Sequence, residues 1–256
     1  MNNLLAILLT LIVGLSFIIG ILITKFTTKK KELTLFATGM SFAVMLGMIM
    51  IDIIPEIGEN IREYPNNEKW LIIIIFTFIG MGLLKGLDSL IPHHDHNHKE
   101  QEKNKKEHND HLFHIGFVTS ISLILHNILE GISIYITAIT NMNLGLMMAL
   151  AVSLHNIPLG IEISAGMNAT KSKEKIKRMI ITLLMLSSFI GAFLLFLFKI
   201  KLNSFLICAL LCTTFGMLIY IALFELLKEI WCYRKNKVTY YGILTGLVIG
   251  ILMVVL

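Results

Sequence analysis

The chain has 256 residues, of which 55% are apolar and only 15% are charged, and its mean hydropathy is +0.77. Soluble globular domains carry about 45–50% apolar and about 25% charged residues. The composition therefore excludes a cytosolic enzyme and a nucleic-acid-binding domain. The net charge of +5 does not indicate a polyanionic partner, because the basic residues gather in short loops. We expect the lipid bilayer to be the main partner of the surface.

Eight apolar runs follow one another along the chain, and each is long enough to cross about 30 Å of hydrocarbon as a helix. In order, they span residues 4–24, 33–57, 70–91, 115–141, 142–170, 179–198, 202–227 and 238–256. None of them alternates with a period of two, which argues against a β-barrel. The sequence therefore predicts an all-α polytopic membrane protein with eight transmembrane helices.

Positive charge follows the odd-numbered loops between these runs. The first, third and seventh loops each hold four Lys or Arg with their edges, and the fifth holds five, which makes 17 against 4 on the opposite side. Lysine and arginine accumulate in cytoplasmic loops of membrane proteins. The odd loops are therefore predicted to be cytosolic, and both termini extracytoplasmic.

Two similar polar motifs interrupt the fourth and fifth runs. The fourth contains His126-Asn127-Ile128-Leu129-Glu130-Gly131, and the fifth contains His155-Asn156-Ile157-Pro158-Leu159-Gly160-Ile161-Glu162. His126 lies eleven residues after the start of its run, about 16 Å at 1.5 Å per residue, and His155 lies at a matching depth from the other side. Because a tight polar turn at 140–143 joins the two runs, we expect the histidines to meet near the bilayer midplane from antiparallel helices.

The chemistry of these residues suits a divalent cation. His126 and Glu130 share one helical face, as do His155 and Glu162, and Pro158 leaves the carbonyl of Leu154 without its helical donor. Imidazole, carboxylate and amide oxygen are typical ligands of Zn²⁺. A single buried histidine would be an ordinary packing residue, but ionisable groups inside a membrane are costly and mark functional sites. The cysteines at 208 and 212 are expected to be packing residues.

The two motifs resemble those of the ZIP family of divalent metal transporters, particularly its short bacterial zinc-transporter branch. The resemblance covers the whole chain, including eight spans and a His-rich loop after the third. It implies zinc transport toward the cytosol, and metal ligation by the family-matching residues His126, Asn127, Glu130, His155 and Asn156. Met45 resembles the thioether ligand that the second helix supplies in the family; the alternative is a plain core methionine.

The chain departs from the family pattern His-Asn-x-Pro-Glu-Gly at several positions. Leu129 replaces the proline of the first motif, Leu159 replaces the glutamate of the second, and Ser188 occupies an acidic position of the sixth helix. Two carboxylates of a two-metal centre are therefore missing. We expect one well-formed metal site, with Glu162 compensating part of the lost charge.

Acidic pairs end the second and seventh runs. Asp52 and Glu56 lie at the predicted outer end, Glu225 and Glu229 at the predicted cytosolic end, and both pairs have the same spacing. This arrangement indicates an inverted repeat, as in many secondary transporters, in which helices one to three are mirrored by helices six to eight. With helices four and five between them, the expected arrangement is 3+2+3. The first pair is interpreted as an access path for cations and the second as an exit path. The alternative is acids that merely sit at the water interface.

Seven histidines gather in residues 92–114, which show no periodic apolar face. We expect this cytosolic loop to be disordered without metal, and to bind metal through His-rich clusters. The first cluster comprises His93, His94, His96 and His98. The chain thus divides into helices one to three (1–91), the His-rich loop (92–114), helices four and five with the metal site (115–170), and helices six to eight (171–256).

The sequence predicts a plasma (inner) membrane transporter rather than an enzyme. Its expected substrate is Zn²⁺, with Fe²⁺, Mn²⁺, Co²⁺ and Cd²⁺ as further candidates because imidazole–carboxylate sites overlap in selectivity. One alternative is a membrane-embedded zinc-dependent hydrolase with Glu130 as its base, although no additional motif such as His-Glu-x-x-His is found. Another is a metal sensor acting through the His-rich loop. Monomer and homodimer both remain open.

Overall fold

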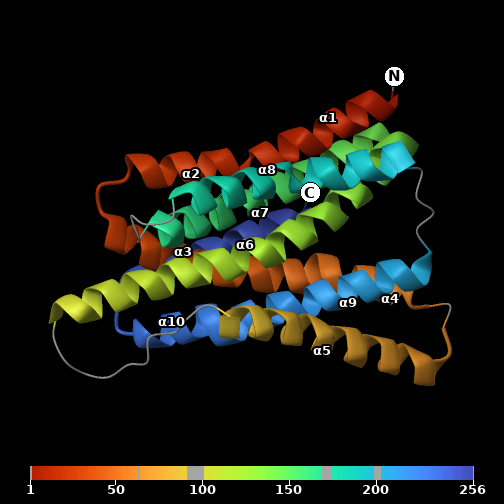
Figure 1. The fold of residues 1–256 in the computed structure, drawn as a ribbon. Coiled ribbons are helices and arrows are strands. Elements are labelled where there is room, and N and C mark those ends of the chain that lie inside the picture. Colours follow the sequence, from red (N-terminus) through yellow and green to blue (C-terminus); the bar gives the residue numbers. More distant parts are fainter. Residues whose placement is uncertain (1, 63, 91–100, 169–173, 199–202, 256) are drawn as a thin grey trace.

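The structure is a computed structural model that describes residues 2–62, 64–90, 101–168, 174–198 and 203–255. Within these ranges every regular element is a helix and no strand occurs. The long helices run alongside one another in a single bundle (Figure 1). The predicted all-helical architecture is therefore confirmed for the described part of the chain.

Thirteen helical elements make up the described chain. They are α1 (Asn2–Leu15), α2 (Phe17–Phe26), α3 (Lys30–Met48), η1 (Ile49–Ile53), α4 (Ile54–Asn60), α5 (Asn66–Leu90), α6 (Gln101–Thr140), α7 (Met142–Asn168), α8 (Glu174–Phe198), α9 (Ser204–Tyr220), η2 (Ile221–Leu226), α10 (Leu227–Cys232) and α11 (Lys237–Val255).

Seven described stretches are long and apolar enough to cross a membrane, and each coincides with one of the first seven predicted runs. α11 is also apolar but shorter. Large apolar side chains are exposed along the outside of α1, α5 and α11. An outward apolar face of this extent is expected when the surrounding solvent is lipid. The prediction of a polytopic membrane protein is therefore confirmed.

Two spans are built from an α-helix that passes through a π-helical turn and continues as a short α-helix. In the second span, η1 separates α3 from α4; in the seventh, η2 separates α9 from α10. Pro55 is the second residue of α4, just after η1, and it has no N–H to donate, so a conventional backbone hydrogen bond is missing there. No proline lies in η2, and the chain offers no comparable local signal for it. π-Helical turns occur mostly at functional sites.

α6 begins earlier than the apolar run predicts. Residues 101–114, which belong to the segment expected to be disordered, form the first turns of this helix. The expectation of disorder is therefore wrong for this half of the segment, because the helix of the fourth span propagates backward into it. The histidines at 93, 94, 96 and 98 lie outside the described residues, so their metal binding stays a prediction.

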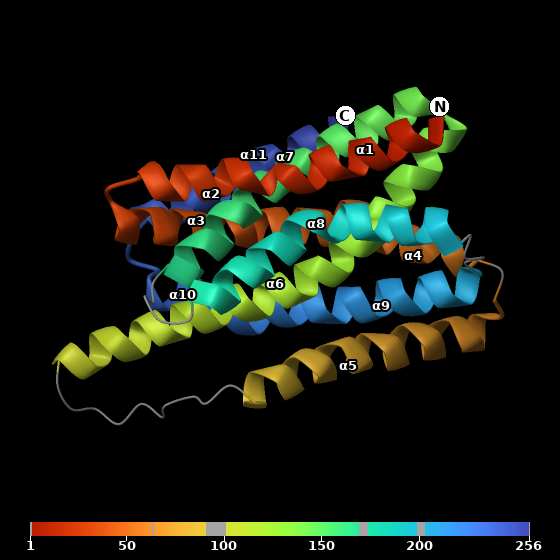
Figure 2. The ribbon, with the colours of Figure 1, turned by 45° about the horizontal axis from the view of Figure 1, so that its top comes forward.

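α6 and α7 form an antiparallel pair with a one-residue connection, as the polar turn predicts. The Asn141 side-chain oxygen accepts from the backbone N–H groups of Asn143 and Leu144, which caps α7. α3 packs against α11, and α5 packs against α9 along one edge of the bundle (Figure 2). α6 packs against α8, α1 and α9, and α7 packs against α2, α3, α1 and α11, so that other helices surround this central pair over much of its length.

Glycines allow several of these helices to approach closely. A Cβ atom on Gly131 of α6 would lie 1.9 Å from the backbone oxygen of Ser188 on α8, and one on Gly160 of α7 would lie 2.7 Å from the backbone oxygen of Phe17. Small residues let helix backbones come together in membranes. The two central helices are therefore held against α8 and α2 by backbone contact.

The α5–α9 crossing gives a test of this packing. A Cβ at Gly80 would lie 1.9 Å from the Thr213 backbone oxygen, whereas one at Gly82, on the same helix, meets nothing within 4 Å. We expect Gly80→Ala to destabilise the protein by about 1–3 kcal/mol through overpacking, and to lower its melting midpoint in detergent. Gly82→Ala is the matched control and should leave that midpoint unchanged or raise it. Equal midpoints for the two variants would contradict the crossing.

Candidate metal centre

The central pair, α6 and α7, brings the two predicted histidines together. The Nε2 atoms of His126 and His155 lie 2.9 and 3.2 Å from the same oxygen of Glu130, Oε1. The imidazole centroids are 6.3 Å apart, with their planes inclined at 38°. All three side chains are buried, and each offers one ligand atom within 4.8 Å of the others. Among the described His, Cys, Asp and Glu residues, this is the one group of three that meets that condition.

The spacing of these atoms is compatible with a shared metal ion. In a tetrahedral Zn²⁺ site with bonds near 2.0–2.1 Å, neighbouring ligand atoms lie about 3.4 Å apart. The two distances to the Glu130 oxygen are within about half an ångström of that value. Both ring nitrogens of each histidine nevertheless lack a hydrogen-bond partner of acceptable geometry in the described part of the chain. Buried polar groups are rarely left in that condition, and a shared cation would satisfy the Nε2 atom of each histidine.

The two asparagines of the motifs are also fully buried. Asn156 donates from Nδ2 to the backbone oxygen of Val13 on α1, at 3.2 Å, while its Oδ1 has no partner among the described residues. Neither polar atom of the Asn127 amide has a partner there. The predicted amide ligands therefore flank the histidines with their oxygens unused.

The acids of the second span lie on the same side of the bundle interior as the histidines. Ser133 on α6 donates from its hydroxyl to Glu56 Oε1, at 3.1 Å. Asp52, within η1, interacts electrostatically with His155, Glu130 and His126. The predicted access path thus consists of two acids at successive levels beside α6.

Other predicted ligands do not join the three-residue group. Glu162 is buried, but it lies seven residues beyond His155, a rise of about 10 Å along α7. Met45 is fully buried within the apolar core, which fits a packing residue and leaves its thioether ligation a prediction. The predicted exit residues, Glu225 and Glu229, are buried on η2 and α10. Their role also stays a prediction.

Two positions where the family pattern has further carboxylates are occupied by buried, uncharged residues in this chain. Leu159 is fully buried in the apolar core, and Ser188 is fully buried with its hydroxyl unpartnered among the described residues. No carboxylate from α8 therefore reaches the group. Glu130 is its sole acidic member, and the binding of a single ion stays a prediction.

Three hydroxyl residues on α6 were missed by the sequence analysis. Ser133 lies seven residues after His126, whereas Ser122 and Thr119 lie four and seven residues before it, so all share its face. The available signal was this helical spacing of small polar residues along an otherwise apolar run. Single hydroxyls are common in membrane helices, and they do not attract notice in the way that a buried charge does.

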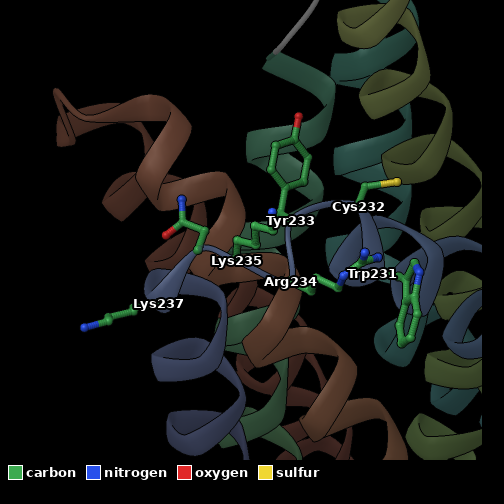
Figure 3. Close-up of a pocket in the computed structure, with 7 residues that line it drawn as sticks. Trp231, Cys232, Tyr233, Arg234, Lys235 and Lys237 are labelled. Carbon is green, nitrogen blue, oxygen red and sulfur yellow. The ribbon is translucent and has the colours of Figure 1, made fainter.

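A separate hollow of about 850 Å³ lies at the turn between α10 and α11 (Figure 3). It is lined by residues 231–237, and the Arg234 guanidinium lies 4.9 Å from the centre of the Trp231 ring. None of the metal-centre residues lines it. The hollow is a basic surface feature of a loop that is predicted to be cytosolic, distinct from the metal centre.

Comparison with known proteins gives one consistent result. A family model described as "ZIP Zinc transporter" matches residues 86–256. A protein named zinc transporter ZupT from Oceanobacillus iheyensis is 32% identical over 257 residues, covering 96% of this chain and 95% of that protein. Proteins of the same name from Streptococcus mutans and Lysinibacillus sphaericus are 30% and 31% identical, and the matches cover 95% and 100% of this chain and 94% and 98% of those proteins.

The bridging oxygen of Glu130 gives a direct test of the centre. Glu130→Gln keeps the shape of the side chain and removes its charge. Loss of a residue that only hydrogen-bonds to a metal ligand already lowers metal affinity by roughly tenfold, so we expect this variant to lose at least that much Zn²⁺ affinity. Isothermal titration calorimetry of the purified protein measures this. Glu68→Gln, at an exposed acid in the first turn of α5, is the matched control. Unchanged affinity in the Glu130 variant would contradict the centre.

Proposed function

The chain belongs to the ZIP family of zinc transporters, and from that premise we propose that it carries Zn²⁺ across a membrane through the centre formed by His126, Glu130 and His155. It transports a divalent metal and is not an enzyme. The observation that carries the proposal is the convergence of two imidazoles on one carboxylate oxygen inside the bundle. The family membership and the names of the relatives give no support to a membrane-embedded hydrolase.

The proposed ligand set extends beyond the three converging side chains. Asn127 and Asn156 supply amide oxygens beside the histidines, an arrangement supported by their unpartnered oxygens. Met45 remains a candidate thioether ligand from the second span. Because Leu159 and Ser188 replace acidic residues of the family pattern, the centre holds one ion rather than two.

The route to the centre runs past Glu56 and then Asp52. Their electrostatic interaction with Glu130 and the histidines supports this order. Two carboxylates raise the local concentration of cations at an entrance. On the opposite side, Glu225 and Glu229 form the exit, and the loop histidines 93, 94, 96 and 98 bind metal in the cytosol.

Eight membrane spans arranged as 3+2+3 complete the proposal, with α11 as the eighth. The paired π-helical turns support an inverted repeat, because η1 and η2 interrupt the second and seventh spans beside Asp52 and Glu225 respectively. The excess of Lys and Arg in odd loops orients both termini away from the cytosol. The protein resides in the plasma (inner) membrane, as a monomer or a homodimer.

Transport runs toward the cytosol. An inside-negative membrane potential favours cation entry by about 2.3 kcal/mol per charge per 100 mV, and a divalent ion gains twice that. Histidines must be neutral to ligate, so acid competes with metal for the centre. Imidazole–carboxylate ligands also accept Fe²⁺, Mn²⁺, Co²⁺ and Cd²⁺, which form the wider substrate class.

Zinc uptake into vesicles reconstituted with the purified protein tests the function. We expect His126→Ala and His155→Ala each to reduce the initial rate of radiolabelled Zn²⁺ uptake to that of protein-free vesicles, because each removes one of three converging ligands. Glu68→Gln should retain the wild-type rate. Wild-type uptake by both histidine variants, at equal protein content, would exclude this centre from the transport route.

Restoring a family carboxylate on α7 should strengthen the centre. We expect Leu159→Glu to raise Zn²⁺ affinity by about tenfold, or 1.4 kcal/mol. Burial of the new charge offsets much of the roughly 8 kcal/mol attraction expected between a carboxylate and a divalent ion at 4 Å. Leu159→Gln is the uncharged control for shape. Calorimetry that finds neither an affinity gain nor a second bound ion in the Glu variant would contradict the assignment of this position.

A further inference from the structure

On the N-terminal side of His126, the face of α6 that carries the ligands continues as a line of hydroxyl groups. Ser122 and Thr119 precede His126 by four and seven residues, so they repeat its face at intervals of about one turn. Both side chains are fully buried. Neither hydroxyl has a hydrogen-bond partner within the described ranges, although the neighbouring Ser120 donates to the backbone oxygen of Gly116 at 2.6 Å. The two unpartnered hydroxyls therefore form a polar line through an apolar core.

The facing helix carries a carboxylate at the level of this line. α6 and α7 are antiparallel, and the histidines 126 and 155 lie level with each other. Thr119 lies seven residues before His126, and Glu162 lies seven residues after His155. Because the helices are antiparallel, these two residues are level as well. The register persists over this stretch, because a Cβ on Gly116 would lie 3.3 Å from both the backbone oxygen of Ile163 and the backbone nitrogen of Met167.

The Glu162 carboxylate has no charge partner in the described structure. Its side chain is only 5% exposed, and its Oε2 atom has no hydrogen-bond partner there. None of the ion pairs among the described residues includes it. A buried carboxylate is costly unless a cation or a hydrogen-bond network compensates it. The two unpartnered hydroxyls and this carboxylate therefore have the composition of an oxygen-ligated cation site.

We propose that Glu162, Thr119 and Ser122 form a second cation position, which receives the metal as it leaves the histidine centre. The inference rests on the proposed transport function and adds a step to it. The position lies about 10 Å from His155 along α7, too far for one ion to contact both. It lies toward the Ile115 end of α6, the end that the loop charges assign to the cytosol.

The ligand atoms of the second position suit it to release Zn²⁺. The histidine centre offers imidazole nitrogens, which hold Zn²⁺ well, whereas the second position offers only oxygen atoms, which are harder and less suited to it. A transport path needs sites that are favourable enough to fill and weak enough to empty. An all-oxygen position on the exit side satisfies the second requirement and prevents the ion from facing a wholly apolar stretch of protein.

Uptake kinetics in reconstituted vesicles test the second position. We expect Glu162→Gln and Thr119→Val to lower the maximal rate of Zn²⁺ uptake by about tenfold for the first and less for the second. KM should stay within about twofold, because the first binding step remains at the histidine centre. Ser120→Ala is the matched control for Thr119→Val, since its hydroxyl is already satisfied by its own helix.

The outcomes separate this inference from the proposed function. Wild-type rates for Glu162→Gln, alongside lost uptake for His126→Ala, would overturn the second position and leave the histidine centre intact. A raised KM with an unchanged maximal rate would also overturn it, because Glu162 would then act in initial binding. Retained uptake by His126→Ala would instead refute the proposed function.

A spectroscopic measurement detects the ion at this position without relying on flux. We expect Glu162→Cys protein titrated with Co²⁺ to show a thiolate-to-cobalt charge-transfer band in the near ultraviolet, relative to wild-type protein. Ser164→Cys, at a buried residue about half a turn around α7, is the control and should show no band. Absence of the band from the Glu162 variant, in protein that is monodisperse and still binds Co²⁺ at the histidine centre, would overturn the proposal.

Discussion

The approach of two imidazoles to one carboxylate oxygen is the interaction on which the architecture depends. Ionisable groups inside a bilayer are costly unless they are shielded from lipid and compensated. Here, helix packing supplies the shielding: Gly131 brings α8 against α6, and Gly160 brings α2 against α7. These contacts surround the ligand-bearing pair and keep its polar face inward. The apolar exterior and the polar interior are therefore two consequences of the same packing.

The sequence alone predicts at which depth the metal site lies better than it predicts which side chains contact one another there. The lengths of the apolar runs and the turn at Asn141 determine which residues of α6 and α7 are level, because helical rise is nearly invariant. Rotation about each helix axis is set by neighbouring helices, so the sequence could not show that one oxygen of Glu130 lies close to both histidines. Pro55 gives a local cause for η1, but η2 has none, and the extension of α6 to Gln101 depends on propagation from an already formed helix.

The departures from the family pattern redistribute negative charge along the interior. Leu159 and Ser188 remove two carboxylates from the level of the histidines, and Glu130 is the sole acid that remains in the group. Other acids lie above and below it: Asp52 and Glu56 on one side, and Glu162 on the other. A divalent ion at the centre is therefore compensated partly at a distance, where attraction is weaker than at contact. Weaker compensation lowers affinity and favours release.

Release is the demanding step for an ion held by imidazole in a dry interior. A centre with three contacting carboxylates would bind zinc strongly, yet the ion would then have to leave all of that charge at once. When carboxylates are spaced along the path, attraction by the next one partly offsets loss of the previous one, so that no single step carries the whole cost. The line of groups from Glu56 through the histidines to Glu162 has this form. On this view, the replacement of acids at the centre and the presence of a buried acid beyond it have the same effect. Both lower the affinity of the centre for the ion and make its release toward the next position easier.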